Sequence, residues 1–252
     1  MIQLQEISLW FGSKRLMTDV TTRFECGMLT ALLGRNGTGK STLLRAIASL
    51  GELQRGNIII DGMPIGELNS VELARRIAFV NTERIAVEAL SVYDLVAIGR
   101  SPYTDWSGHL RGKDREIIER ALRITGVEAM RNRYVESLSD GEAQRVMIAR
   151  ALAQDTPVIL LDEPTAFIDL PNRYELCTLL TRLAHDERKC IIFSTHELDI
   201  ALSLADSIAL VDTPYLRHMP TDEMIASGNI ERLFNSDNVA FDAASRSIRM
   251  QR

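Results

Sequence analysis

Short apolar runs alternate with segments of helical periodicity in the second half of the chain. The runs are typical of buried strands, and the segments between them place apolar residues three and four positions apart, as amphipathic helices do. This alternation predicts parallel strands joined by right-handed crossovers, and therefore an α/β fold. The predicted strands are 158–163, 190–195 and 207–211, and the predicted helices are 172–185 and 197–205. An earlier apolar run, 29–33, is followed by its own helical segment.

The N-terminal part of the chain shows strand signals instead. Apolar positions on both sides of the turn 12–15 predict two strands, and 56–62 predicts another that ends in an Asp-Gly turn. No helix separates these strands except the one that follows 29–33, so we expect a small antiparallel layer. After a short strand at 77–80, helical signals dominate, including Ser91 with Asp94 as a capping box and a helix from Lys113 to Thr125. We therefore expect a single domain, 1–252, with a helical subdomain inserted at about 84–156.

A glycine-rich loop, GRNGTGKST at 34–42, directly follows the apolar run 29–33. Its spacing is that of a phosphate-binding P-loop, in which backbone N–H groups and the start of the next helix face the phosphates. Lys40 would reach the β- and γ-phosphates, and Ser41 would bind Mg²⁺. An ordinary glycine-rich turn is the alternative, but the strand before the loop and the helix after it favour nucleotide binding. The predicted nucleotide-binding residues are Gly34, Asn36, Gly37, Thr38, Gly39, Lys40, Ser41 and Thr42.

Polar residues also follow two of the predicted parallel strands. Asp162 and Glu163 end the strand at 158–163, and His196 follows the strand at 190–195. The carboxyl ends of parallel strands meet at one edge of the sheet, where ligands bind. Asp162 can hold Mg²⁺, while Glu163 and His196 can orient the water that attacks the γ-phosphate. A polar turn and a structural histidine are the alternatives. The remaining histidines, His109, His185 and His218, are interpreted as surface or helix residues.

Composition narrows the class of protein. The net charge of −5 gives no overall basic surface for nucleic acid. Three cysteines, far apart and without a C-x-x-C pair, fit reduced thiols in a cytosol. We find no signal peptide and no apolar run of the roughly 20 residues that a membrane-spanning helix needs. Any role at a membrane is therefore expected to depend on a partner.

The segment 138–145, LSDGEAQR, followed by the helix 146–153, is similar to the signature of ABC transporter ATPase subunits. This resemblance covers nearly the whole chain. It implies a head-to-tail homodimer in which Ser139 and Gly141 of one subunit close on ATP and Mg²⁺ held by the other. It also assigns Phe11 to adenine stacking, with Trp10 as the near alternative, and Asp169 to the D-loop that links the two sites. A capped surface helix is the alternative for the signature segment alone.

The chain departs from the family pattern at a few positions. Asp140 and Glu142 add negative charge to the signature and should weaken phosphate binding unless their side chains point away. Ala166 and Ile168 are mild changes in the D-loop. Thr82 stands where the family has a glutamine that binds Mg²⁺, so we expect Thr82 to reach the metal through water, with Glu83 as the other candidate.

Two further segments, 99–103 and 151–157, resemble ATPases of importers for iron chelates, haem and cobalamin. A helix end is the alternative for the first segment. The resemblance implies an ATPase subunit on the cytoplasmic face of the membrane, bound to two membrane-spanning permease subunits that receive cargo from a periplasmic or surface binding protein. A soluble ABC ATPase of DNA repair or translation is one rival interpretation. A cassette that binds ATP without hydrolysing it is the other: Glu163 and His196 argue against it, while Thr82 in place of the glutamine keeps it open.

Overall fold

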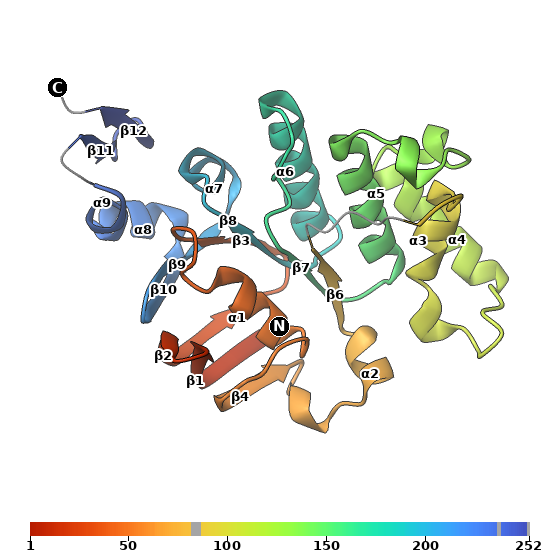
Figure 1. Cartoon of the computed structure of the whole chain (residues 1–252), viewed down its shortest axis with the longest axis horizontal. Helices are drawn as coiled ribbons and strands as arrows, with labels where there is room; N and C mark the ends of the chain where they lie inside the picture. Colours follow the sequence, from red (N-terminus) through yellow and green to blue (C-terminus); the bar gives the residue numbers. More distant parts are fainter. Residues whose placement is uncertain (82–86, 236–237, 251–252) are drawn as a thin grey trace.

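The largest sheet forms the centre of the molecule. A computed structural model describes residues 1–81, 87–235 and 238–250. The six-stranded sheet has the order β10-β9-β3-β8-β7-β6, and all neighbouring pairs are parallel except β10 with β9. Its strands are β3 (Met28–Leu33), β6 (Ile77–Val80), β7 (Val158–Leu161), β8 (Cys190–Thr195), β9 (Ser207–Asp212) and β10 (Tyr215–Pro220). The prediction of a parallel α/β core is confirmed (Figure 1).

A second sheet is antiparallel, as the N-terminal pattern predicts. Its order is β2-β1-β4-β5, with strands β1 (Ile2–Phe11), β2 (Lys14–Phe24), β4 (Arg55–Ile60) and β5 (Met63–Pro64). Helix α1 (Lys40–Ile47) packs its Leu43, Leu44 and Ile47 into the hydrophobic cluster that this sheet shares with the central one. Burial of these side chains fixes α1, and with it the loop 34–39, between the two sheets.

Edge strand β10 joins the two sheets. His218 of β10 stacks on Phe24 of β2 with ring centroids 4.8 Å apart, and its ring nitrogens lie 2.9 Å from Thr22 Oγ1 and 3.0 Å from Ser207 Oγ. The interpretation of His218 as a surface or helix residue is therefore wrong, because the imidazole bridges two strands of different sheets. His185 does end helix α6 (Leu170–His185), and His109 is exposed.

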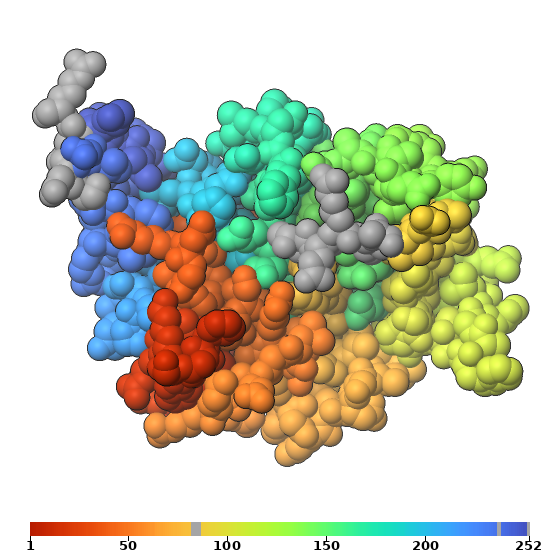
Figure 2. Space-filling view, in the orientation of Figure 1, coloured from red at the N-terminus to blue at the C-terminus, as the bar shows by residue number. Residues whose placement is uncertain are grey.

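The helical segment lies at one end of the molecule (Figure 2). It contains α3 (Val92–Ile98), α4 (Gly112–Ile124) and α5 (Asp140–Ala153), which pack on one another in the larger hydrophobic cluster. Helix α5 begins six residues earlier than the predicted helix 146–153 because Ser139 caps it and its first turn is polar. The helical insertion in an α/β core is observed, while its delimitation as part of one domain stays a prediction.

The C-terminal end of α5 is fastened to strand β6. The Arg150 guanidinium donates to the Phe79 carbonyl at 3.0 Å, and Gln154 Nε2 donates to the Ile77 carbonyl at 2.8 Å. The buried Arg100 side chain donates to Asp114 and to the Ala153 carbonyl, both at 2.9 Å. The two segments that resemble importer ATPases, 99–103 and 151–157, therefore touch each other at this junction.

The remaining elements follow the central sheet or connect its strands. Helix α7 (Leu198–Leu204) connects β8 to β9, and α2 (Ser70–Ala74) precedes β6. Beyond β10 come α8 (Thr221–Ala226), α9 (Asn229–Phe234) and a separate hairpin of β11 (Val239–Asp242) and β12 (Ser247–Met250), none of which the sequence pattern predicted. Among the described residues, no helix is long and apolar enough to span a membrane.

Candidate nucleotide-binding site

The loop 34–39 turns sharply between β3 and α1, and two glycines make this turn possible. A side chain at Gly34 would place its Cβ 2.9 Å from the Val211 carbonyl oxygen of β9, closer than real Cβ atoms approach. Gly39 has φ +99°, a backbone conformation that L side chains rarely adopt. Thr38 Oγ1 donates to the Arg35 carbonyl at 2.9 Å and closes the loop on itself. The loop therefore has the tight curvature that phosphate cradling requires.

Lys40 is buried at the base of this loop. Its Nζ donates to the Gly34 carbonyl at 2.9 Å and to the Arg35 carbonyl at 3.2 Å, and it lies 3.8 Å from Glu163 Oε1. Burial lowers the pKa of Lys40, while the nearby carboxylates of Glu163 and Asp162 act in the opposite direction. A cation that is held by two neutral carbonyls and one carboxylate can exchange these partners for phosphate oxygens.

A serine, an aspartate and a second serine converge beside Lys40. Ser41 Oγ donates to Asp162 Oδ1 at 2.8 Å, and Ser194 Oγ donates to the same oxygen at 2.7 Å. Ser194 Oγ also accepts the Glu163 N–H at 2.8 Å. Ser194 fixes the turn that holds both carboxylates, a function that the sequence analysis missed. The available signal was a lone serine near the end of the apolar strand 190–195, because a fully buried hydroxyl needs a partner.

Glu163 and His196 come together at the same sheet edge. His196 Nδ1 lies 3.6 Å from Glu163 Oε1, the oxygen that also faces Lys40. Glu163 has φ +42°, a strained value for a non-glycine residue, and strain of this kind persists only where the surroundings enforce it. The backbone conformation therefore aims this carboxylate at the space between the P-loop and His196.

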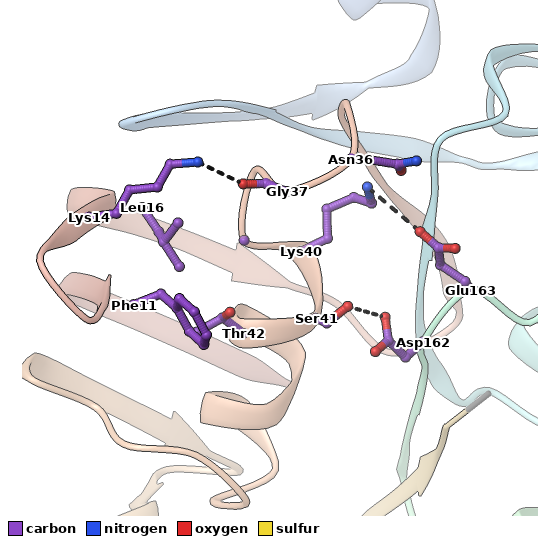
Figure 3. Close-up of a pocket in the computed structure, with 11 residues that line it drawn as sticks. Phe11, Lys14, Leu16, Asn36, Gly37, Lys40, Ser41, Thr42, Asp162 and Glu163 are labelled. Carbon is purple, nitrogen blue, oxygen red and sulfur yellow. Dashed lines mark hydrogen bonds and ion pairs between the residues drawn. The ribbon is translucent and has the colours of Figure 1, made fainter. Parts of the chain in front are cut away.

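Lys40, Ser41, Asp162 and Glu163 border one cavity of about 620 Å³, whose lining among the described residues does not include Ser194 or His196. One side is formed by Phe11, Lys14 and Leu16 from the β1–β2 hairpin, as Figure 3 shows. Phe11 is 74% exposed, so its aromatic ring is accessible for stacking on a planar base. Trp10, the alternative aromatic residue, is not among the lining residues and instead lies under the Arg15 guanidinium at 5.5 Å. The other residues lining this cavity are Asn36, Gly37, Gly39, Lys40, Ser41, Thr42, Asp162 and Glu163.

The signature residues lie elsewhere. Ser139 caps α5, with its Oγ accepting the Glu142 N–H at 3.3 Å, and Asp169 caps α6, with its Oδ1 accepting the Asn172 N–H at 3.2 Å. Among the described residues, the lining of the cavity does not include Ser139, Gly141 or Asp169. The cap geometry fits either a surface helix or a phosphate-binding helix N-terminus.

The negative charge of the signature is partly compensated. The Glu142 carboxylate turns back to accept the Ser139 N–H at 2.8 Å and forms an ion pair with Arg133 at 3.0 Å. The Ser139 N–H, together with Arg133, lowers the pKa of Glu142. The Glu142 carboxylate is therefore held at the start of α5 by the Ser139 N–H and by Arg133, whose charge partly offsets its own. Thr82 and Glu83, the candidates for the missing glutamine, lie outside the described residues.

A strand, a P-loop and a helix, with two carboxylates and a histidine at the same sheet edge, define a nucleotide-binding P-loop fold. The family model described as "ABC transporter" matches residues 17–166, more than half of the chain. The chain therefore belongs to the ABC transporter family, in the class of its ATP-binding and ATP-hydrolysing subunits.

Relatives named as transport ATP-binding proteins support this membership. The chain is 35% identical to a probable siderophore transport ATP-binding protein of Bacillus subtilis, over 93% of this chain and 86% of that one. It is also 35% identical to the achromobactin transport ATP-binding protein of Dickeya dadantii, over 94% of this chain and 88% of that one. The rival interpretation of a DNA-repair or translation ATPase is thereby disfavoured.

Among solved structures, an inward-facing ABC transporter described as being of the metal-chelate type aligns with a TM-score of 0.80 and 27% identity. The alignment covers 92% of this chain and 88% of that one. A dimeric ATP-binding cassette, MJ0796, in a post-hydrolysis state with ADP and phosphate, aligns with a TM-score of 0.73 and 26% identity, over 88% of this chain and 99% of that one.

Proposed function

We propose that this chain powers the import of an iron chelate by hydrolysing ATP in the cavity between the β1–β2 hairpin and the edge of the central sheet. The observation that carries the ATP site is the convergence of Lys40, Asp162, Glu163 and His196, supplied by separate segments of the chain. The cargo class follows from the names of the relatives, which include siderophore, petrobactin and iron(3+)-hydroxamate transport. These names favour siderophores over the haem and cobalamin that the sequence resemblance also implies.

The residues at the loop can bind the triphosphate without rebuilding the fold. Lys40 exchanges the Gly34 and Arg35 carbonyls for β- and γ-phosphate oxygens, while the backbone N–H groups of 36–42 face the phosphate chain. The hydroxyl of Ser41 and the carboxylate of Asp162 already share a hydrogen bond, so two hard oxygen donors meet where Mg²⁺ prefers to bind. When bound there, Mg²⁺ would neutralise charge on the phosphates.

Glu163 is positioned to orient and polarise the attacking water. Its carboxylate faces the cavity, and His196 beside it can hydrogen-bond the γ-phosphate or the same water. The Glu163 backbone is held by Ser194, which also holds Asp162, so one side chain keeps the two carboxylates in fixed relative positions. This division of roles is the reason to favour hydrolysis over a passive ATP-binding switch.

We further propose that two copies of the chain close head to tail around two ATP molecules. Ser139 and Gly141 at the N-terminus of α5 would then receive the γ-phosphate held by the opposite copy, and Asp169 would connect the two sites. The dimeric cassette among the structural relatives supports this arrangement. The pair would act at the cytoplasmic face of the membrane, under two permease subunits that receive cargo from a binding protein.

The test is ATP turnover of the chain reconstituted with its permease in lipid vesicles. We expect turnover to rise when a binding protein loaded with ferric siderophore is added, and the Glu163→Gln complex to remain inactive. Stimulation by haem or cobalamin alone would contradict the siderophore assignment. Absence of turnover in every preparation that binds ATP would contradict hydrolysis.

A further inference from the structure

Lys14, at the tip of the β1–β2 hairpin, is a second lysine at the nucleotide cavity that no motif includes. The tight turn at Gly12 and Ser13 makes Phe11 and Lys14 direct cross-strand partners. Side chains of such partners project from the same face of the hairpin. Leu16, two residues further along β2, shares this face, and all three line the cavity.

The opposite face of the hairpin carries the neighbouring pair. Trp10 and Arg15 are also cross-strand partners, and the Arg15 guanidinium lies over the Trp10 ring at 5.5 Å. The alternation along each strand therefore divides two aromatic residues and two cations between the two faces. Phe11 with Lys14 faces the nucleotide cavity, and Trp10 with Arg15 does not line it.

The side chain of Lys14 reaches over the P-loop. Its Nζ donates to the Gly37 carbonyl at 3.2 Å, as Figure 3 shows, so the ammonium is held against the P-loop beside the cavity that both residues line. An ammonium has three N–H donors, and this bond uses one. The others remain available to a phosphate oxygen in the cavity that Lys14 lines. Lys40, at the start of α1, lines the same cavity and is bonded to the Gly34 and Arg35 carbonyls.

We propose that Lys14 is a second phosphate-binding cation that contacts the triphosphate from the hairpin side while Lys40 contacts it from the helix side. The hairpin then contacts ATP at two points, with Phe11 at the base and Lys14 at the phosphate chain. This inference rests on the proposed nucleotide site. It adds Lys14 to that site, and the charge of this side chain gives the hairpin a contact with the phosphates in addition to the contact with the base.

The experiment separates phosphate from base recognition by using two ligands. Binding of ATP and of tripolyphosphate, which has no base, is measured by competition against a fluorescent ATP analogue. We expect Lys14→Met to weaken both ligands by about tenfold, because a charge-assisted hydrogen bond is lost. Phe11→Ala should weaken ATP and leave tripolyphosphate unchanged. Arg15→Met, the matched control on the opposite face, should bind both ligands as the parent does.

Two conservative variants distinguish charge from loop support. Lys14→Gln keeps an N–H donor for the Gly37 carbonyl but removes the charge, whereas Lys14→Arg keeps both. We expect Lys14→Gln to behave like Lys14→Met and Lys14→Arg to restore most of the affinity. Full affinity in Lys14→Gln, or loss of ATP binding without loss of tripolyphosphate binding, would show that Lys14 only supports the loop or the hairpin.

Lys40→Ala separates failure of this inference from failure of the site itself. If Lys40→Ala loses ATP while Lys14→Met binds both ligands normally, the site stands and the role of Lys14 is refuted. If Lys40→Ala also binds ATP as the parent does, the nucleotide site is in the wrong place and the inference fails with it.

Discussion

The nucleotide cavity and the N-terminus of α5 are both places where a polar turn leads into a helix, yet they differ in what surrounds them. At the cavity, Ser41 bonds to Asp162, and Lys40 forms an ion pair with Glu163. At α5, Ser139 and Glu142 satisfy each other in a capping box, and neither lines the cavity. The cavity contains the groups proposed to bind and hydrolyse ATP. The N-terminus of α5 has only a capped helix end, which would face a nucleotide bound by another molecule. This comparison is the basis for the proposal that a complete site combines the two regions from two copies of the chain.

The largest expected effect is at Glu163, which lines the nucleotide cavity. Glu163→Gln should keep ATP affinity and lower turnover by roughly two orders of magnitude or more, because the amide cannot accept a proton from water. The variant should accumulate as an ATP-bound dimer in light scattering, since closure no longer leads to hydrolysis. A strictly monomeric profile at saturating ATP would count against the pairing of the two regions.

Lys40→Ala tests whether the cavity binds nucleotide at all. ATP affinity should fall by about an order of magnitude or more, measured by calorimetry, because the buried ammonium at the base of the loop is lost. Arg45→Ala, which removes an exposed cation from the same helix, is the matched control and should bind ATP normally. Equal affinities in all three proteins would refute the site.

Ser139→Ala tests the other region. Loss of the N-cap should lower the free energy of unfolding by about 1 kcal/mol. Turnover should fall by roughly tenfold if Ser139 also faces ATP on the opposite copy, while ATP affinity of the isolated chain stays unchanged. Ser91→Ala removes the cap of α3, where Ser91 Oγ accepts the Asp94 N–H at 3.0 Å, and should show the stability loss without the turnover loss. Equal turnover in the two variants would leave α5 as a surface helix.

The smallest effect concerns His218, which packs β10 against the C-terminal end of β2. Burial lowers the pKa of His218 below its ordinary value of 6.5, so the unfolded chain binds a proton more readily than the folded one. Stability from this group is therefore complete above pH 6.5 and decreases as the pH falls below it. His218→Gln should flatten this pH dependence in urea unfolding between pH 7 and 5. An unchanged slope in His218→Gln would contradict the assignment.

Much of the fold and of the nucleotide cavity can be predicted from local sequence. The P-loop spacing, the apolar strands and the carboxylates after 158–161 sit within short segments, so the pattern predicts them and the topology brings them together. Lys14 is different, because its role depends on pairing with Phe11 and on reaching Gly37, which only the folded hairpin supplies. Strand β10 was missed because its half-buried residues, including Arg217 and His218, show no clean alternation. The expected water-bridged contact of Thr82 stays a prediction.

The hydrogen bonds from Arg150 and Gln154 to β6 fix the C-terminal end of α5, so a tilt of the helix would move mainly its N-terminal end. Its 14 residues span about 21 Å at roughly 1.5 Å per residue, with Arg150 and Gln154 bonded to the strand at one end and Ser139 at the other. A tilt of about 10° at the fixed end moves Ser139 by roughly 4 Å, more than the length of a hydrogen bond. In the proposed dimer, such a tilt would move Ser139 toward or away from the phosphate held by the opposite copy. Gly99 allows the end of α3 to pack closely against the C-terminal end of α5, since a Cβ there would lie 2.3 Å from the Arg150 carbonyl oxygen.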